Sequence, residues 1–136
     1  MSVEVNWLAI VLATVSSMVV GALWYGPLFG KEWRSLAKLG AKFEPTPQAL
    51  GIAFVTALFM AYVLAHVTFL SNRYFGNSWM MDALMTGFWM WAGFQVTRMV
   101  MRDAFEGRRK KLTLINTGND FATIMAMALV IGLMKL

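Results

Sequence analysis

The chain has 136 residues, of which 59% are hydrophobic and 14% are charged, with a mean hydropathy of +0.60. A soluble domain carries about 45–50% apolar and about 25% charged residues, so an ordinary soluble domain and a disordered chain are both excluded. The absence of Cys excludes disulfides and thiolate chemistry, and the single His excludes a multi-histidine zinc or haem site within one subunit. We therefore expect an integral membrane protein without a metal or cofactor.

Four stretches are long and apolar enough to cross a hydrocarbon core, which takes about 20 residues. They lie at about 5–25, 48–70, 78–99 and 112–134 and together form one predicted domain. Glu4 precedes the first stretch and no basic segment comes before it, so we expect this helix to be retained rather than cleaved as a signal peptide. The predicted fold is all-α, an integral membrane four-helix up-and-down bundle.

The net charge of +5 is distributed unevenly over the connections. Of the 12 Lys and Arg residues, all but two lie in or beside the connections that follow the first and third stretches. Because basic loops stay in the cytoplasm, this asymmetry predicts a bacterial inner-membrane protein with cytoplasmic basic loops and both termini outside. The run Arg108–Lys111 could also bind anionic lipid headgroups. It is short and lacks interleaved aromatic residues, so no nucleic-acid partner is expected.

Small residues recur at every fourth position in three of the stretches. The ridges consist of Ala13, Ser17 and Gly21 in the first stretch, Ala53, Ala57, Ala61 and Ala65 in the second, and Gly118 and Ala122 in the fourth. Residues at i and i+4 share a helix face, and small side chains let helices approach closely in lipid. The ridges predict that these three helices pack together. They do not distinguish contacts within one chain from contacts between chains.

Two levels of the predicted bundle carry polar side chains within the spans, where ionisable groups are costly and mark function by default. Near the outer end, His66 and Asp82 lie at one depth on antiparallel helices, so they either form a hydrogen bond or reach interfacial water separately. Near the inner end lie Gln95, Arg98, Asn116, Asn119 and Asp120. A pair between Arg98 and Asp120, helped by Gln95 and Asn116, is interpreted as a structural clasp, with a transport or proton site as the alternative.

Three segments resemble a known family. They are NWLAI at 6–10, GALWYGPLFGKEW at 21–33 and FEGRRKKLTLINTG at 105–118, and they resemble the bacterial membrane proteins grouped as domain of unknown function 1761. The resemblance implies a small four-helix membrane protein without an established activity. The family pattern carries onto Asn6, Trp7, Gly21, Trp24, Tyr25, Gly26, Pro27, Gly30, Trp33, Asn116 and Gly118. Gln95, Arg98 and Asn119–Asp120 depart from it, so a pair between Arg98 and Asp120 would be a feature of this chain.

The sequence contains no phosphate-binding glycine loop, no pair of catalytic carboxylates and no nucleophile–base set. We therefore expect a protein that is not an enzyme. The leading hypothesis is a packing or assembly module that associates with itself or serves as an accessory subunit of a membrane complex, because its many small ridges suit helix–helix contacts. The alternative is a small homo-oligomeric transporter or channel that uses Arg98, Asp120 and Gln95.

Overall fold

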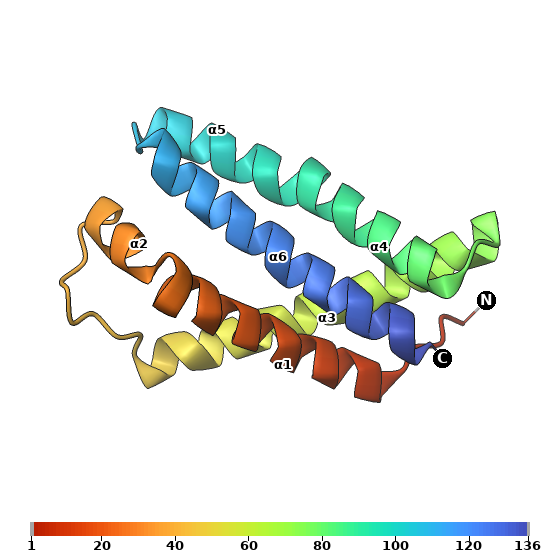
Figure 1. Ribbon diagram of the computed structural model, residues 1–136. Helices are drawn as coiled ribbons and strands as arrows, with labels where there is room; N and C mark the ends of the chain where they lie inside the picture. Colours follow the sequence, from red (N-terminus) through yellow and green to blue (C-terminus); the bar gives the residue numbers. More distant parts are fainter. Residues whose placement is uncertain (1, 136) are drawn as a thin grey trace.

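The computed structural model describes residues 2–135, which form helices joined by short connections (Figure 1). In chain order the elements are α1 (Trp7–Leu23), the π-helical turn η1 (Trp24–Leu28), α2 (Gly30–Leu36), α3 (Pro47–Phe75), α4 (Trp79–Met90), the π-helical turn η2 (Trp91–Val96), α5 (Thr97–Phe105) and α6 (Lys110–Met134). Residues 2–135 contain no strand, so the predicted all-α class is confirmed.

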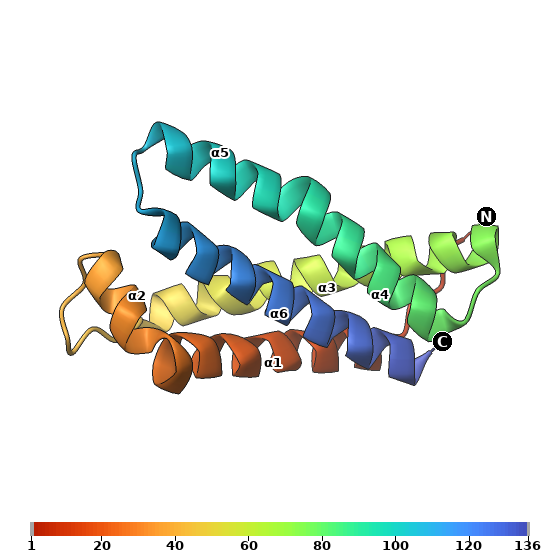
Figure 2. The same cartoon turned by 45° about the horizontal axis from the view of Figure 1, so that its top comes forward.

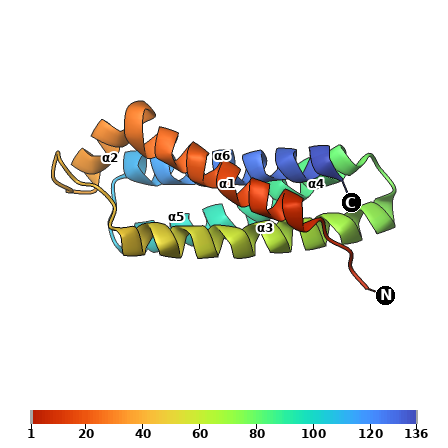
Figure 3. The ribbon, with the colours of Figure 1, turned by 90° about the horizontal axis from the view of Figure 1, so that it is seen from below.

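Four rods run in alternating directions, each antiparallel to the next in the chain: α1, α3, the continuous α4–η2–α5 and α6 (Figures 1 and 2). Both termini lie at one end, which we call the terminal end; α2 and the turn between α5 and α6 lie at the other, the basic end. α6 packs against α1 and α4, and α3 packs against the same two helices from the other side. Seen from below, α1 lies in front of α6, and α3 lies in front of α5 (Figure 3).

The helices begin and end where the sequence supplies caps. The side-chain oxygens of Asn6, Thr46 and Ser78 each accept the backbone N–H three residues ahead, at 3.0, 3.1 and 3.3 Å. These bonds satisfy N–H groups that a helix start leaves without partners. Gly76 follows the last residue of α3, and Gly107 lies just after α5; both have φ of 66°, the left-handed conformation that glycine adopts without steric cost.

Three helical segments are long and apolar enough to cross a membrane, namely 7–28, 47–75 and 110–134. They correspond to the first, second and fourth predicted spans. The third predicted span, 78–99, falls within the α4–η2–α5 rod, whose α-helix is divided by η2, so its membrane crossing stays a prediction. Two helical segments were not predicted: α2 lies in the first connection, and α5 continues to Phe105 in the third.

The apolar core lies toward the terminal half. Ile10, Leu64, Ala83, Ile124 and Ile131 come from four different rods and are almost completely buried together. Two glycines on α4 and α6 permit this close packing. A Cβ added at Gly87 would lie 3.2 Å from Ala128 Cβ, and one added at Gly132 would lie 2.6 Å from Met80 Sδ.

The predicted small-residue ridges pack only in part. Ala13, Ser17, Ala61 and Ala65 are buried, and α1 packs against α3. Gly118 lies against Trp24, whereas a Cβ added at Gly21 would meet nothing within 4 Å. In the basic half, Ala53 is exposed and Ala57 is half-buried. The ridge of α3 is therefore an internal contact in one half of the molecule and a surface in the other.

Candidate functional site

The end of α1 is fastened to α6 by two aromatic side chains. Trp24 Nε1–H donates to the backbone oxygen of Ile115 at 2.9 Å, and Tyr25 Oη–H donates to Asn116 Oδ1 at 2.8 Å. Gly118 makes room for the indole, because a Cβ added there would lie 2.9 Å from Trp24 Cζ2. We call Trp24, Tyr25, Asn116 and Gly118 the aromatic joint. All four belong to the family pattern that the sequence suggested.

The turn η1 sets the geometry of the aromatic joint. Pro27 lies inside η1 and has no N–H to donate, so the regular α-helical ladder ends there. α2 then folds back closely: a Cβ added at Gly30 would collide with the backbone oxygen of Tyr25. Trp33 on α2 packs its ring 4.6 Å from that of Tyr25. The segment 24–33 thus forms a compact aromatic corner that abuts α6 at the basic end.

The face of α6 that is apolar in the terminal half becomes polar in the basic half. Ile131 and Ile124 are buried in the core, and Asp120 lies four residues before Ile124 on the same face. Asn116 lies one further turn along and bonds Tyr25. Asp120 is half-buried between these two positions.

The structure separates the side chains of the predicted inner cluster. Arg98 is exposed, and it forms no salt bridge with Asp120 in the part of the chain described. Gln95 instead donates its Nε2–H to Met60 Sδ at 3.3 Å, and Asn116 belongs to the aromatic joint. Within residues 2–135, Asn119 Oδ1 and Gln95 Oε1 are buried without a hydrogen-bond partner. The predicted clasp between Arg98 and Asp120 is therefore not formed.

A different carboxylate fastens the basic end, and the sequence analysis missed it. Asp103 is 2% exposed; its Oδ2 accepts from Thr113 Oγ1 at 2.7 Å and its Oδ1 accepts from Arg102 at 3.2 Å. The contact joins α5 to α6 across their turn. An Asp four residues beyond a predicted span resembles an exposed loop residue, and only the continuation of α5 to Phe105 brings it against α6.

The predicted outer pair is also replaced by a different contact. The carboxylate of Asp82 is buried and accepts from Asn72 Nδ2 at 2.8 Å and Asn77 Nδ2 at 3.1 Å. His66 does not bond Asp82; its ring lies 5.6 Å from that of Tyr62, and its Nδ1 is buried without a partner in the part of the chain described. Asp82 thus ties the α3–α4 turn together rather than joining two spans.

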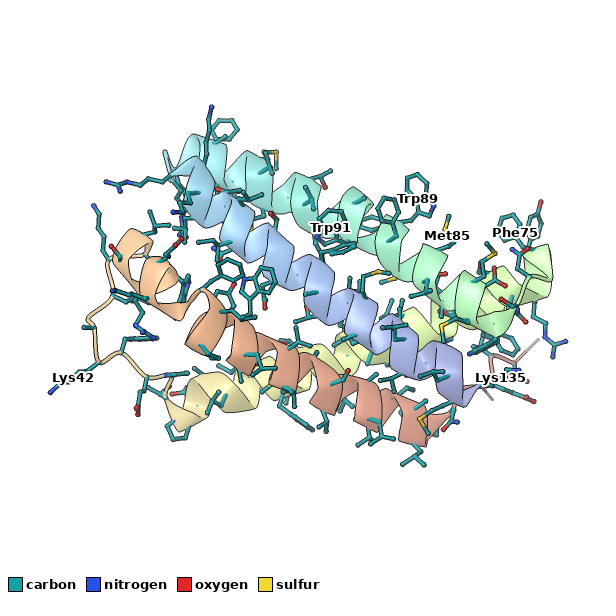
Figure 4. The ribbon with its side chains drawn as sticks, viewed as in Figure 1. Lys42, Phe75, Met85, Trp89, Trp91 and Lys135 are labelled. Carbon is teal, nitrogen blue, oxygen red and sulfur yellow. The ribbon has the colours of Figure 1, made fainter. Side chains whose placement is uncertain are left out.

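Three indoles donate to backbone oxygens of α6. Besides Trp24, Trp91 Nε1–H donates to Thr117 at 3.0 Å and Trp79 Nε1–H donates to Ile131 at 2.8 Å. Trp89 behaves differently: it is 62% exposed and points away from the other helices (Figure 4). Three bonds from two different rods make α6 the element to which the others are attached. These hydrogen bonds hold the helices in position and do not by themselves carry out chemistry.

The basic run at the start of α6 is exposed and partly paired. Arg108 Nε lies 2.7 Å from Glu106, and Lys111 Nζ lies 3.0 Å from Glu32 on α2. Arg109 and Lys110 make no salt bridge among the residues described. Within the described residues, two cations of this run, Arg109 and Lys110, are therefore unpaired at the surface of the basic end.

Comparison with known proteins supports the predicted family. A family model described as "Protein of unknown function (DUF1761)" matches residues 8–132, which is nearly the whole chain. No curated protein and no solved structure matches the chain.

Proposed function

Because the chain belongs to the DUF1761 family, whose description assigns no activity, we propose a function from the surface that its own helices leave uncovered. The protein is a non-enzymatic assembly module of the bacterial inner membrane, and it associates with a second copy of itself through the basic half of α3. All four rods cross the bilayer, with the basic connections in the cytoplasm and both termini outside.

The observation that carries this proposal is the exposure of one half of a single helix. Every residue from 47 to 56 is exposed, including Ile52 at 58% and Val55 at 64%. Farther along the same helix, Ala61 and Ala65 are 0% and 5% exposed. α3 thus begins as an isolated apolar helix and becomes a packed one after about three turns.

A second copy fits this surface better than an unrelated partner because the ridge already packs a helix of this chain. Ala61 and Ala65 are buried in one cluster with Ile10 and Ala13 of α1, and Ala53 and Ala57 continue the same four-residue spacing. In lipid no hydrophobic force drives helices together, so close contact between small residues supplies much of the attraction. Two α3 helices crossing near Ala53 would repeat this kind of contact around a twofold axis.

Disulfide trapping tests the proposed contact, because the chain has no Cys of its own. We expect Ala53→Cys, oxidised in native membranes, to form a covalent dimer. Val55→Cys is the matched control on another face of α3, and Ala61→Cys is the control for a buried position on the same ridge. Both controls are expected to stay monomeric. Equal crosslinking at positions 53 and 55, or none at 53, would contradict the proposal.

The transport alternative has less support than assembly. It needs Arg98, Asp120 and Gln95 to face a common space, whereas Arg98 is exposed and Gln95 contacts Met60. Anionic lipid headgroups are a further proposed partner, since Arg109 and Lys110 lie at the bilayer surface when the basic connections are cytoplasmic.

A further inference from the structure

A second uncovered surface lies beside the ridge of α3. A groove of about 470 Å³ runs between α3 and the α4–η2 segment. Its lining is Thr56, Phe59, Met60, Val63, Val67, Met90, Phe94 and Gln95. Small-molecule sites typically have volumes of about 300–1,000 Å³ and are mostly apolar with a few polar groups, and this groove fits that description.

Gln95 is the polar group of the groove that lacks full hydrogen bonding. Thr56, the other polar lining residue, donates its hydroxyl to its own helix, to the backbone oxygens of Ile52 and Ala53 at 2.9 and 3.0 Å. Gln95 Nε2 reaches only the thioether of Met60, which is a weak acceptor, and Gln95 Oε1 is buried without a partner. A buried amide without partners is costly, about 1–3 kcal/mol from protein mutations, so the groove favours an occupant that supplies a donor.

The depth of Gln95 restricts the polar group of that occupant. Gln95 lies seven residues before Arg102 on one rod, so at 1.5 Å per residue the amide is about 10 Å deeper than the basic surface. A phosphate or another charged headgroup at that depth would be expensive to bury. A neutral hydroxyl is small, donates one hydrogen bond and also accepts, so it satisfies either end of the amide.

We propose that this groove binds a neutral lipid carrying a free hydroxyl group, with its apolar chain along α3. Its hydroxyl donates to Gln95 Oε1, which is enclosed in this structure, after the amide turns to bring that oxygen to the groove surface. Long-chain alcohols and diacylglycerols share this chemistry. The groove lies beside the alanine ridge, since Thr56, Met60 and Val63 are rotated by about 100° or less from it around α3. The two proposals are therefore tested separately, this one on monomeric protein.

A matched pair of ligands isolates the donated hydrogen bond. Oleyl alcohol and oleyl methyl ether share one chain, but only the alcohol can donate. Native mass spectrometry of the full-length protein, released from detergent micelles, measures the bound fraction of each. We expect the wild-type chain to bind the alcohol about fivefold to tenfold more tightly, the effect of one net hydrogen bond. Dioleoylglycerol, run in parallel, distinguishes a two-chain ligand from a single-chain one.

Two variants show whether the preference comes from this groove. Gln95→Leu removes the amide at similar volume and should bind both ligands equally, at the level of the ether in the wild type. Val63→Trp fills the groove and should lose both ligands. Equal binding of alcohol and ether by the wild type, or an alcohol preference retained by Gln95→Leu, would overturn the proposal. The experiment needs only monomeric protein, so its result can be interpreted even if the assembly proposal fails.

Discussion

The terminal and basic halves of the molecule are built from the same four rods but are held together by different means. In the terminal half, apolar side chains such as Ile10, Leu64 and Ile124 fill a common core. In the basic half, α3 stands apart, and α1, α5 and α6 are joined by the polar contacts of Tyr25 and Asp103. The terminal half is held together by a packed core, and the basic half by a few polar contacts. The basic half therefore leaves surface exposed for partners and ligands.

Both π-helical turns belong to the basic half or border it, which is a second difference between the two halves. η1 places Trp24 and Tyr25 against α6, and η2 contains Gln95. A π-helical turn interrupts the regular i→i+4 ladder and is often found at functional sites. The apolar core of the terminal half has no such turn.

The largest expected effect contrasts two alanines on one ridge. Ala61 is 0% exposed, so Ala61→Leu forces extra carbon into a filled core and should lower the free energy of unfolding by about 3 kcal/mol. Ala53→Leu adds the same atoms to an exposed position and should leave the stability of the monomer unchanged. Chemical unfolding of both variants in dilute mild detergent, followed by circular dichroism, measures the difference. A comparable loss in both variants would mean that the two halves are equally packed.

The next effect compares the carboxylates near the two ends of the α4–η2–α5 rod. Asp82→Ala removes the carboxylate that accepts from the amides of Asn72 and Asn77, and Asp103→Ala removes the one that accepts from the Thr113 hydroxyl. Hydrogen bonds to charged groups contribute about 1.5–3 kcal/mol, so each variant should lose about 2 kcal/mol in the same unfolding experiment.

Glu106→Ala is the control for the carboxylates. It removes an exposed pair with Arg108 and should cost less than about 1 kcal/mol. If Asp103→Ala behaves like this control while Asp82→Ala does not, the α5–α6 contact is not what holds the basic end together.

Hydrophobic run length predicted the helical content well, because it depends only on residues close together in the chain. The helices that contain the first, second and fourth predicted spans begin and end within a few residues of the expected positions, and α3 alone runs five residues longer, to Phe75. The same reasoning could not tell Ala53 from Ala61. Their spacing is identical, and only the path of α3 relative to α1 makes one exposed and the other buried.

The polar pairs show a second limit of what can be predicted from the sequence. Depth along a helix follows from counting residues, so Arg98 and Asp120 were placed at similar levels. Whether they meet depends on rotation about each helix, about 100° for every residue, and η2 alters the phase just before Arg98. The aromatic joint was visible only as a motif. Nothing in the spacing of Trp24 and Tyr25 indicated that their partners would be Ile115 and Asn116, 91 residues away.

The smallest expected effect tests what the two halves share, which is attachment to α6 by indoles. Trp79 bonds α6 in the terminal half and Trp24 bonds it in the basic half. Replacement by Phe keeps most of the ring and removes the donor, so each variant should lose about 1 kcal/mol, the net value of one hydrogen bond. Trp89→Phe is the matched control, because that indole is exposed. Equal losses at positions 79 and 24 would show that α6 is held equally along its length, so that the open basic half results from the path of α3 alone. A loss at Trp79 without one at Trp24 would instead place the weakness in the aromatic joint.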